Sequence, residues 1–198
     1  VKILLLDSGK LQEEEAAFAQ KKGYSKHDKP EALYTVEDAE KVFPLLHGVD
    51  FEEEISLISE LDFKFFNAGH ILGAAILMLK VKGQNQIKKI VFSGDLGRYH
   101  DPILNPPARL PFADILFLES TYGDRVSKIK NPEDELGLTI REAYRRGGVA
   151  VIPAFAVDRT QEIIYALDQL AHEGLLPKIP VYIDSPVSVK ATMAMRGH

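Results

Sequence analysis

Two nearby stretches of the sequence decide the fold: FNAGHILGAAILML, residues 66–79, and VFSGDLGRYHDP, residues 91–102. Each stretch places one side chain that binds metals well beside glycines at the end of an apolar run. The two side chains are His70 and Asp95, an imidazole and a carboxylate, which suit zinc or manganese. The first question for this chain is therefore whether these side chains meet.

The apolar runs next to them predict that they do. Residues 74–81 (AAILMLKV) and 87–92 (IKKIVF) are typical of strands, and KGQNQ, residues 82–86, predicts the turn of a hairpin. In an antiparallel hairpin the start of the first strand lies beside the end of the second. We therefore expect His70 and Asp95 at one edge of a sheet.

Two further strands are predicted, at residues 63–67 (FKFFN) and 114–119 (DILFLE). The proline-rich residues 99–111 before the second of these predict an ordered surface loop. Glu119 ends the last strand, at a similar edge. Beside a metal-binding histidine, such a carboxylate can orient an imidazole by hydrogen bonding.

The number of metal ligands is too small for a complete site. A catalytic zinc takes about three protein ligands and a water molecule. The other histidines form no His-x-His or His-Glu-x-x-His pattern, and the nearest to Asp95 in sequence is His100; they are His27, His47, His100, His172 and His198. The sequence thus predicts half of a metal site.

The composition excludes several classes of protein and of metal site. The chain has 198 residues, a net charge of −5 and no cysteine, which excludes disulfides and thiolate zinc sites. No apolar run reaches the roughly 18 residues of a membrane span, and no signal peptide pattern opens the chain. The lack of cysteine fits the cytoplasm, which is the compartment that we expect. Because the chain is acidic, any site for a polyanion must be local. The glutamate runs at 13–15 and 52–54 are predicted to be solvated helix faces.

The N-terminal part is predicted to hold a strand and two helices. Residues 1–8 (VKILLLDS) are typical of a buried strand, and residues 10–22 of a helix that ends at Gly23. Thr35 is expected to cap a helix that runs to about residue 46, with an apolar inner face of Ala39, Val42, Phe43 and Leu46. A chain that starts inside a core strand is expected to be a fragment.

After residue 125 the predicted elements change from short strands to alternating helices and strands. A helix is predicted over residues 132–146, followed by a strand at 149–155 (VAVIPAF), a helix over 158–174 and a strand at 179–185 (IPVYIDS). A strand–helix–strand unit implies parallel strands and a right-handed crossover. Asp158 with Gln161 fits a variant of the capping box at the start of the second helix.

Five motifs occur in the order GHILGAA, SGDLGR, ESTYGDR, GGVAVIPAFAVDRTQEIIYAL and VYIDSPVSVKAT. Together they resemble the β-CASP branch of the metallo-β-lactamase superfamily, zinc-dependent nucleases that act on RNA. The resemblance implies an α/β fold. Residues 1–122 would be the second part of a metallo-β-lactamase αββα sandwich, and residues 123–198 the first part of a parallel-sheet β-CASP domain.

The resemblance also implies roles for particular residues. His70 is similar to a zinc ligand, Asp95 to the carboxylate that bridges two zinc ions, and Glu119 to the acidic residue that supports a catalytic histidine. The upstream His-x-His-x-Asp-His motif of the family and its later histidines are absent here. We therefore expect the middle of a longer RNA hydrolase, inactive by itself.

Other positions bear on the substrate and on departures from the family. Arg159, at the start of a predicted helix, and Ser185, at a predicted strand end, are candidates for contacts with RNA. Ala74 stands where a serine is common in the family, and Asp158 stands where a glycine is common.

Two other functions stay open. One is a hydrolase of small esters or lactones, which the strand–helix–strand unit disfavours. The other is a metal-free scaffold subunit of an RNA-processing complex, which the presence of His70, Asp95 and Glu119 disfavours. The choice between endonuclease and exonuclease, and the oligomeric state, a homodimer included, are left open.

Overall fold

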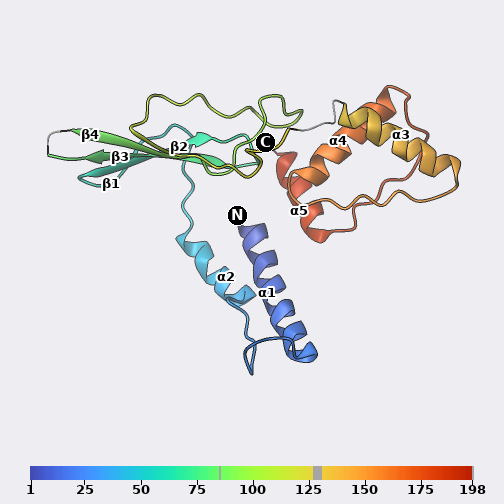
Figure 1. The fold of residues 1–198 in the computed structure, drawn as a ribbon, viewed down its shortest axis with the longest axis horizontal. Coiled ribbons are helices and arrows are strands. Elements are labelled where there is room, and N and C mark those ends of the chain that lie inside the picture. The colour runs from blue at the N-terminus through green and yellow to red at the C-terminus, as the bar shows by residue number, and fades with distance from the viewer. Residues whose placement is uncertain (85, 127–130, 198) are drawn as a thin grey trace. The chain divides into compact units, whose positions relative to one another are not determined.

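A computed structural model describes residues 1–84, 86–126 and 131–197 (Figure 1). The chain divides into two compact units. One joins Val1–Gly48 to the segment from Ile183 onward, and the other is Val49–Tyr182. No helix in the described part of the chain is long and apolar enough to cross a membrane.

The first unit is helical. It contains α1 (Lys2–Lys22), α2 (Val36–Val42), the short 3₁₀-helix η1 (Phe43–Leu45) and α5 (Pro186–Met195), and α1 contacts both α2 and α5. The predicted strand at residues 1–8 is wrong, because these residues form the first turns of α1. Leucine, lysine and glutamate favour a helix, and the described residues of this unit contain no strand with which the run could pair. The predicted helix end at Gly23 is confirmed, with φ of 66°.

The predicted start of α2 is also confirmed. Thr35 and Asp38 form a capping box, in which Oγ1 of Thr35 accepts a hydrogen bond from the Asp38 amide at 3.2 Å. The helix is shorter than expected, since Pro44 has no amide hydrogen and only a 3₁₀ turn follows Val42. Of the predicted inner face, Ala39 is buried, whereas Val42 and Leu46 are exposed.

The second unit is built on a five-stranded sheet in the order β1-β2-β3-β4-β5. The first four strands are antiparallel and β5 runs parallel to β4. The strands are β1 (Ile55–Ile58), β2 (Leu61–Asn67), β3 (Ala75–Lys82), β4 (Ile87–Phe92) and β5 (Ile115–Phe117). The predictions for β2 to β5 are confirmed. At the β3–β4 turn Gly83 donates its amide hydrogen to the carbonyl of Gln86, and Asn85 lies outside the described residues.

The strand β1 was not predicted. Its presence shows that the predicted helix at the glutamate run 52–54 is wrong. Residues 52–54 are not helical but lead directly into β1. Of the three carboxylates, that of Glu54 forms ion pairs with the sheet residues Lys64 and Lys80.

One face of the sheet carries the core, which consists of Phe66, Ala68, Ile76, Met78 and Val91. The proline-rich loop after β4 covers this face with Ala108, Leu110 and Ala113. It is pinned to the end of β2, where the carbonyl of Asn67 accepts from the Ala108 amide at 2.9 Å. The predicted ordered loop is therefore confirmed.

The rest of the unit is helical, and here two predictions are wrong. The helices α3 (Pro132–Arg145) and α4 (Arg159–His172) appear as expected and contact each other. Residues 149–155 and 179–185 form no strand. Phe155 is 86% exposed and Tyr182 85% exposed. An apolar run becomes a strand only where its backbone can pair, and the described residues offer these runs no strand partner.

Candidate functional site

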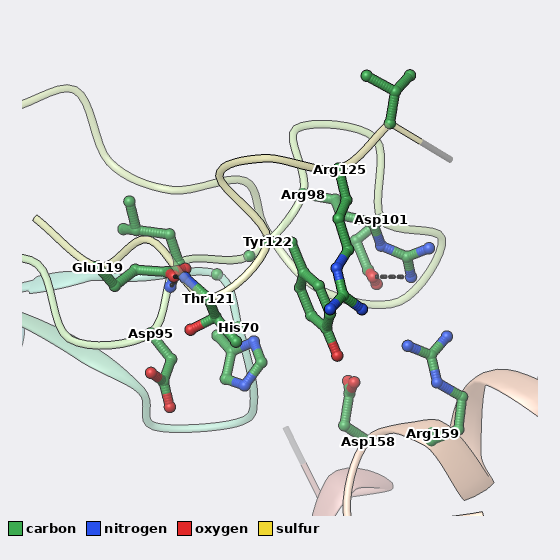
Figure 2. Close-up of a pocket in the computed structure, with 14 residues that line it drawn as sticks. His70, Asp95, Arg98, Asp101, Glu119, Thr121, Tyr122, Arg125, Asp158 and Arg159 are labelled. Atoms are coloured by element: carbon green, nitrogen blue, oxygen red, sulfur yellow. Dashed lines mark hydrogen bonds and ion pairs between the residues drawn. The ribbon is translucent and has the colours of Figure 1, made fainter. Parts of the chain in front are cut away.

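The register of the sheet brings three strand ends to one edge. Asn67 of β2 pairs with Ala75 of β3, so residues 68–74, which include His70, form the loop at this edge. Phe92, the last residue of β4, pairs with Phe117, the last residue of β5, and Asp95 and Glu119 follow these strands. His70, Asp95 and Glu119 all line one cavity of about 800 Å³ (Figure 2). The expected meeting of the three residues is therefore found.

A backbone contact locks the two loops that carry His70 and Asp95. The Gly97 amide donates to the carbonyl of Ala68 at 2.9 Å. A Cβ atom on Gly97 would lie 1.6 Å from the carbonyl oxygen of Gly69, so no other residue fits there. Gly69 itself has φ of 65°, a conformation that side chains disfavour. The glycines beside His70 and Asp95 thus allow their loops to cross.

Glu119 fixes the turn that presents Asp95. Its carboxylate accepts hydrogen bonds from the Thr121 amide at 2.9 Å and from the Leu96 amide at 3.2 Å. The Glu119 amide donates to Oγ of Ser93 at 2.9 Å. These amide donors, first Thr121 and then Leu96, lower the pKa of Glu119, and the nearby charge of His70 lowers it further. Glu119 is therefore an ionised carboxylate whose structural contact is with the loop of Asp95.

His70 and Asp95 have the right chemistry for zinc, but they are too few. Within the described ranges, no three histidine, cysteine or acidic side chains are grouped so that they could hold a metal ion. His100 is exposed and does not line the cavity. The donor types fit the expected metal, and the number of donors does not complete a site within this chain.

The opposite wall of the cavity is a network of charges. Arg98 forms an ion pair with Asp101 at 2.8 Å and a second one with Glu162 of α4. Glu162, whose side chain is only 9% exposed, also pairs with Arg159 at 2.5 Å. Arg159 lines the cavity as the sequence suggested, but its guanidinium is held by a buried carboxylate. The predicted contact of Arg159 with a phosphate stays a prediction.

Asp158 adopts an unusual conformation beside this network. It has φ of 73° and ψ of −72°, and the Arg159 amide donates to the carbonyl of Val157 at 3.1 Å. This is a γ-turn of the rare positive-φ type. The predicted capping box is wrong, because the Asp158 side chain makes no cap hydrogen bond and points into the cavity (Figure 2). Burial raises the pKa of Asp158, and the charge of Asp101 adds to the rise.

Ser185 lies in the first unit and has a different role from the one expected. It precedes α5 rather than ending a strand, and its Oγ accepts from the Ser188 amide at 3.1 Å. Ser185 is therefore a helix cap, and its contact with RNA stays a prediction.

Four charged or aromatic residues of the cavity were missed at the sequence level: Arg98, Asp101, Tyr122 and Arg125. Each lies within seven residues of Asp95 or Glu119 in the sequence. Their positions in the sequence could have identified them, because they follow the predicted strands that end at the same edge of the sheet as His70. Tyr122 is 70% exposed and the Arg125 guanidinium lies 5.8 Å from its ring centroid.

Comparison with known proteins gives the family. No protein-family model matches the chain. Ribonuclease TTHA0252 of Thermus thermophilus is 34% identical over 159 residues, 80% of this chain and 35% of that protein. Transcription termination factor FttA of Methanosarcina mazei is 35% identical over 146 residues, 70% of this chain and 22% of that protein. Cleavage and polyadenylation specificity factor 73 of Drosophila melanogaster is 32% identical over 161 residues, 80% of this chain and 23% of that protein.

The chain spans only about a fifth to a third of the length of these relatives. The matched region nevertheless covers most of this chain and includes the motifs that build the cavity. The chain belongs to the β-CASP branch of the metallo-β-lactamase superfamily.

Proposed function

We propose that the chain is part of a metal-dependent ribonuclease that hydrolyses phosphodiester bonds of RNA during RNA processing or decay. The observation that carries the proposal is the meeting of His70 and Asp95 in one large cavity whose other wall bears arginines. A metal-binding edge opposite guanidinium groups suits a phosphodiester, because metal ions and guanidinium groups both stabilise the negative charge on phosphate oxygens. Two of the relatives described above are named as a ribonuclease and a cleavage factor, which supports this proposal. The compartment that we propose is the cytoplasm.

In the proposed enzyme His70 and Asp95 are metal ligands, and Asp95 contributes to two zinc sites. Bound metal would lower the pKa of a water molecule and stabilise charge at the attacked phosphate. The missing ligands would come from parts of the longer protein, so this chain alone should be inactive. Its sheet would be one layer of the metallo-β-lactamase sandwich, which agrees with the exposed apolar pair of Phe92 and Phe117 on the face opposite the core.

The other residues of the cavity have supporting roles in this proposal. Glu119 holds the Asp95 turn in place through two amide hydrogen bonds. Arg159 and Arg98 contact phosphate oxygens of the RNA, and Glu162 keeps both guanidinium groups in position. A positioned guanidinium loses less conformational entropy when the phosphate binds.

The proposal is tested on two proteins, this chain and a version extended on its N-terminal side. Both are measured for bound zinc by elemental analysis and for cleavage of a labelled single-stranded RNA. We expect the longer protein alone to hold about two zinc ions and to cut RNA. In it, Asp95→Asn should lower the cleavage rate by at least about 100-fold, since a carboxylate that would hold the metal is lost.

The matched control is Asp124→Asn in the longer protein, because Asp124 lies in the same ESTYGDR segment and does not line the cavity. It should cut RNA at the native rate. If the longer protein binds no metal and cuts no RNA, the ribonuclease proposal is wrong and the metal-free scaffold takes its place.

A further inference from the structure

Two groups on the arginine wall of the cavity take no part in the proposed metal site. They are the exposed ring of Tyr122 and the carboxylate of Asp158. We propose that they form a nucleobase subsite, in which Tyr122 stacks on a base of single-stranded RNA and Asp158 accepts hydrogen bonds from the edge of that base. The subsite rests on the proposed function, since it takes RNA as the ligand, and its preferred base is guanine.

Tyr122 has the surroundings of a stacking platform. Its side chain lines the cavity and is 70% exposed, although an aromatic ring gains free energy when it is buried. The guanidinium of Arg125 lies 5.8 Å from the ring centroid, and Figure 2 shows it against the ring. A base that stacks on Tyr122 would bury the ring and also benefit from the nearby cation.

The backbone conformation of Asp158 indicates that its side chain has a functional role. Positive φ in a γ-turn is strained for any residue with a Cβ atom, and glycine would relieve the strain. The carboxylate has no hydrogen bond or ion pair with any residue that the structure describes. A strained residue that holds an unpaired carboxylate in a cavity is expected to have a ligand.

The charge of Asp158 restricts what that ligand group can be. An ionised carboxylate repels phosphate and accepts hydrogen bonds from donors. A nucleotide offers two kinds of neutral donor, the N–H groups of the base and the ribose hydroxyl. Guanine presents two adjacent donors, N1–H and the N2 amino group, which match the two oxygens of a carboxylate. The other bases present one donor group at the corresponding edge.

The two groups border the same part of the cavity. Figure 2 shows the hydroxyl end of Tyr122 and the carboxylate of Asp158 directed toward each other. Arg159 and Arg98 lie on the same wall and are available for the phosphate of the same nucleotide. One nucleotide can therefore meet a ring face, a carboxylate and a guanidinium at once.

The test measures binding of the chain to labelled oligoribonucleotides UUUXUUU by fluorescence polarisation, with X as guanine, adenine, cytosine, uracil or inosine. We expect guanine to bind about tenfold more tightly than uracil, and inosine, which lacks the N2 amino group, to fall between them. A 2′-deoxyguanosine at X separates the two donors. It should bind like guanosine if the base edge is read, and more weakly than both guanosine and uridine if the ribose hydroxyl is read.

Three variants separate the subsite from a structural role. Asp158→Asn should remove the preference for guanine without weakening the binding of the all-uracil strand. Tyr122→Leu should weaken every strand by about tenfold, and Tyr122→Phe, which keeps the ring, should bind like the native chain.

Equal affinity for guanine and uracil, or an equal effect of Asp158→Asn on every strand, overturns the subsite and leaves the ribonuclease proposal standing. A guanine preference that Asp158→Asn abolishes, in a protein whose extended version cuts no RNA, supports the subsite and overturns the ribonuclease. If the native chain binds none of the strands, the subsite is wrong, and cleavage by the extended protein decides the ribonuclease proposal separately.

Discussion

Asp158 shows how a single residue can be placed against its own conformational preference. Its φ of 73° and ψ of −72° lie in a region that costs on the order of 1–3 kcal/mol for a residue with a side chain. The carboxylate is also partly buried near Asp101, which raises its pKa. Backbone and electrostatics therefore both disfavour an aspartate here.

The first prediction follows from this strain. Asp158→Gly should raise the free energy of unfolding by about 1 kcal/mol, because glycine adopts positive φ without strain and the partly buried carboxylate is removed. The midpoint of thermal unfolding should rise by roughly 2–4 °C. Asp158→Asn, which removes only the charge, should stabilise less. A glycine variant that melts below the native chain contradicts the strain argument.

Glu119 is the opposite case, a carboxylate whose surroundings favour its charge. The Thr121 and Leu96 amides lower its pKa from the ordinary value of 4.5. A lowered pKa in the folded state contributes stability that is present above pH 4.5 and is lost as the pH falls toward the lowered value.

The second prediction concerns this pH dependence. Glu119→Gln should lower the stability at neutral pH, and the stability of this variant should fall less steeply than that of the native chain as the pH is lowered below about 4.5. The measurement is urea unfolding at several pH values. Glu60→Gln is the control, since Glu60 is exposed and should leave the slope unchanged. Parallel curves for native and Glu119→Gln proteins would contradict the role of the two amide bonds.

At the scale of elements, the site depends on two crossing loops. The loop between β2 and β3 carries His70, and the loop after β4 carries Asp95. They touch backbone to backbone at Gly69 and Gly97, where there is no room for a side chain. The positions of His70 and Asp95 are therefore set by the contact of the loops, and not by the strands alone.

The third prediction tests the crossing. Gly97→Ala should lower the free energy of unfolding by about 3 kcal/mol, because its Cβ atom would lie 1.6 Å from the Gly69 oxygen and the loops would have to separate. Gly48→Ala is the matched control, since no atom lies within 4 Å of the added methyl group. Denaturant unfolding of both variants gives the measurement. Equal stability of the two would show that the loops separate at little cost.

At the scale of the whole molecule, the unit Val49–Tyr182 joins a sheet to a helical part through charge. Arg98 follows β4, and its guanidinium pairs with the buried Glu162 of α4. Arg159 shares the same carboxylate. The wall of the cavity thus depends on one acidic residue of the helix.

The fourth prediction concerns that residue. Glu162→Gln should lower the stability by about 2 kcal/mol, a value reduced from that of a fully buried pair because both arginines are half-exposed. Hydrogen exchange of the α4 amides should become faster. Asp168→Asn on the same helix, where the side chain is 61% exposed, should change the stability by less than about 0.5 kcal/mol. If the two variants behave alike, the ion pairs contribute little to the attachment of α4.

The sequence alone predicted much of the sheet and the site edge. Apolar strand-like runs separated by turn residues identify β2 to β5. The geometry of an antiparallel hairpin places His70 beside Asp95. These features are local, because strand periodicity, turn chemistry and antiparallel register all follow from residues close in sequence. The helix ends at Thr35 and Gly23 were predicted for the same reason.

The tertiary structure decided what depends on partners distant in sequence. The runs at residues 1–8, 149–155 and 179–185 are apolar enough for strands, but a strand needs a neighbouring backbone, and among the described residues they have none. The conformation of Asp158 and the pairing of Arg98 with Glu162 were likewise invisible to local patterns. The sequence by itself determined the strands and the chemistry of the His70–Asp95 edge, whereas only tertiary packing decided which apolar runs pair and which charges face the cavity.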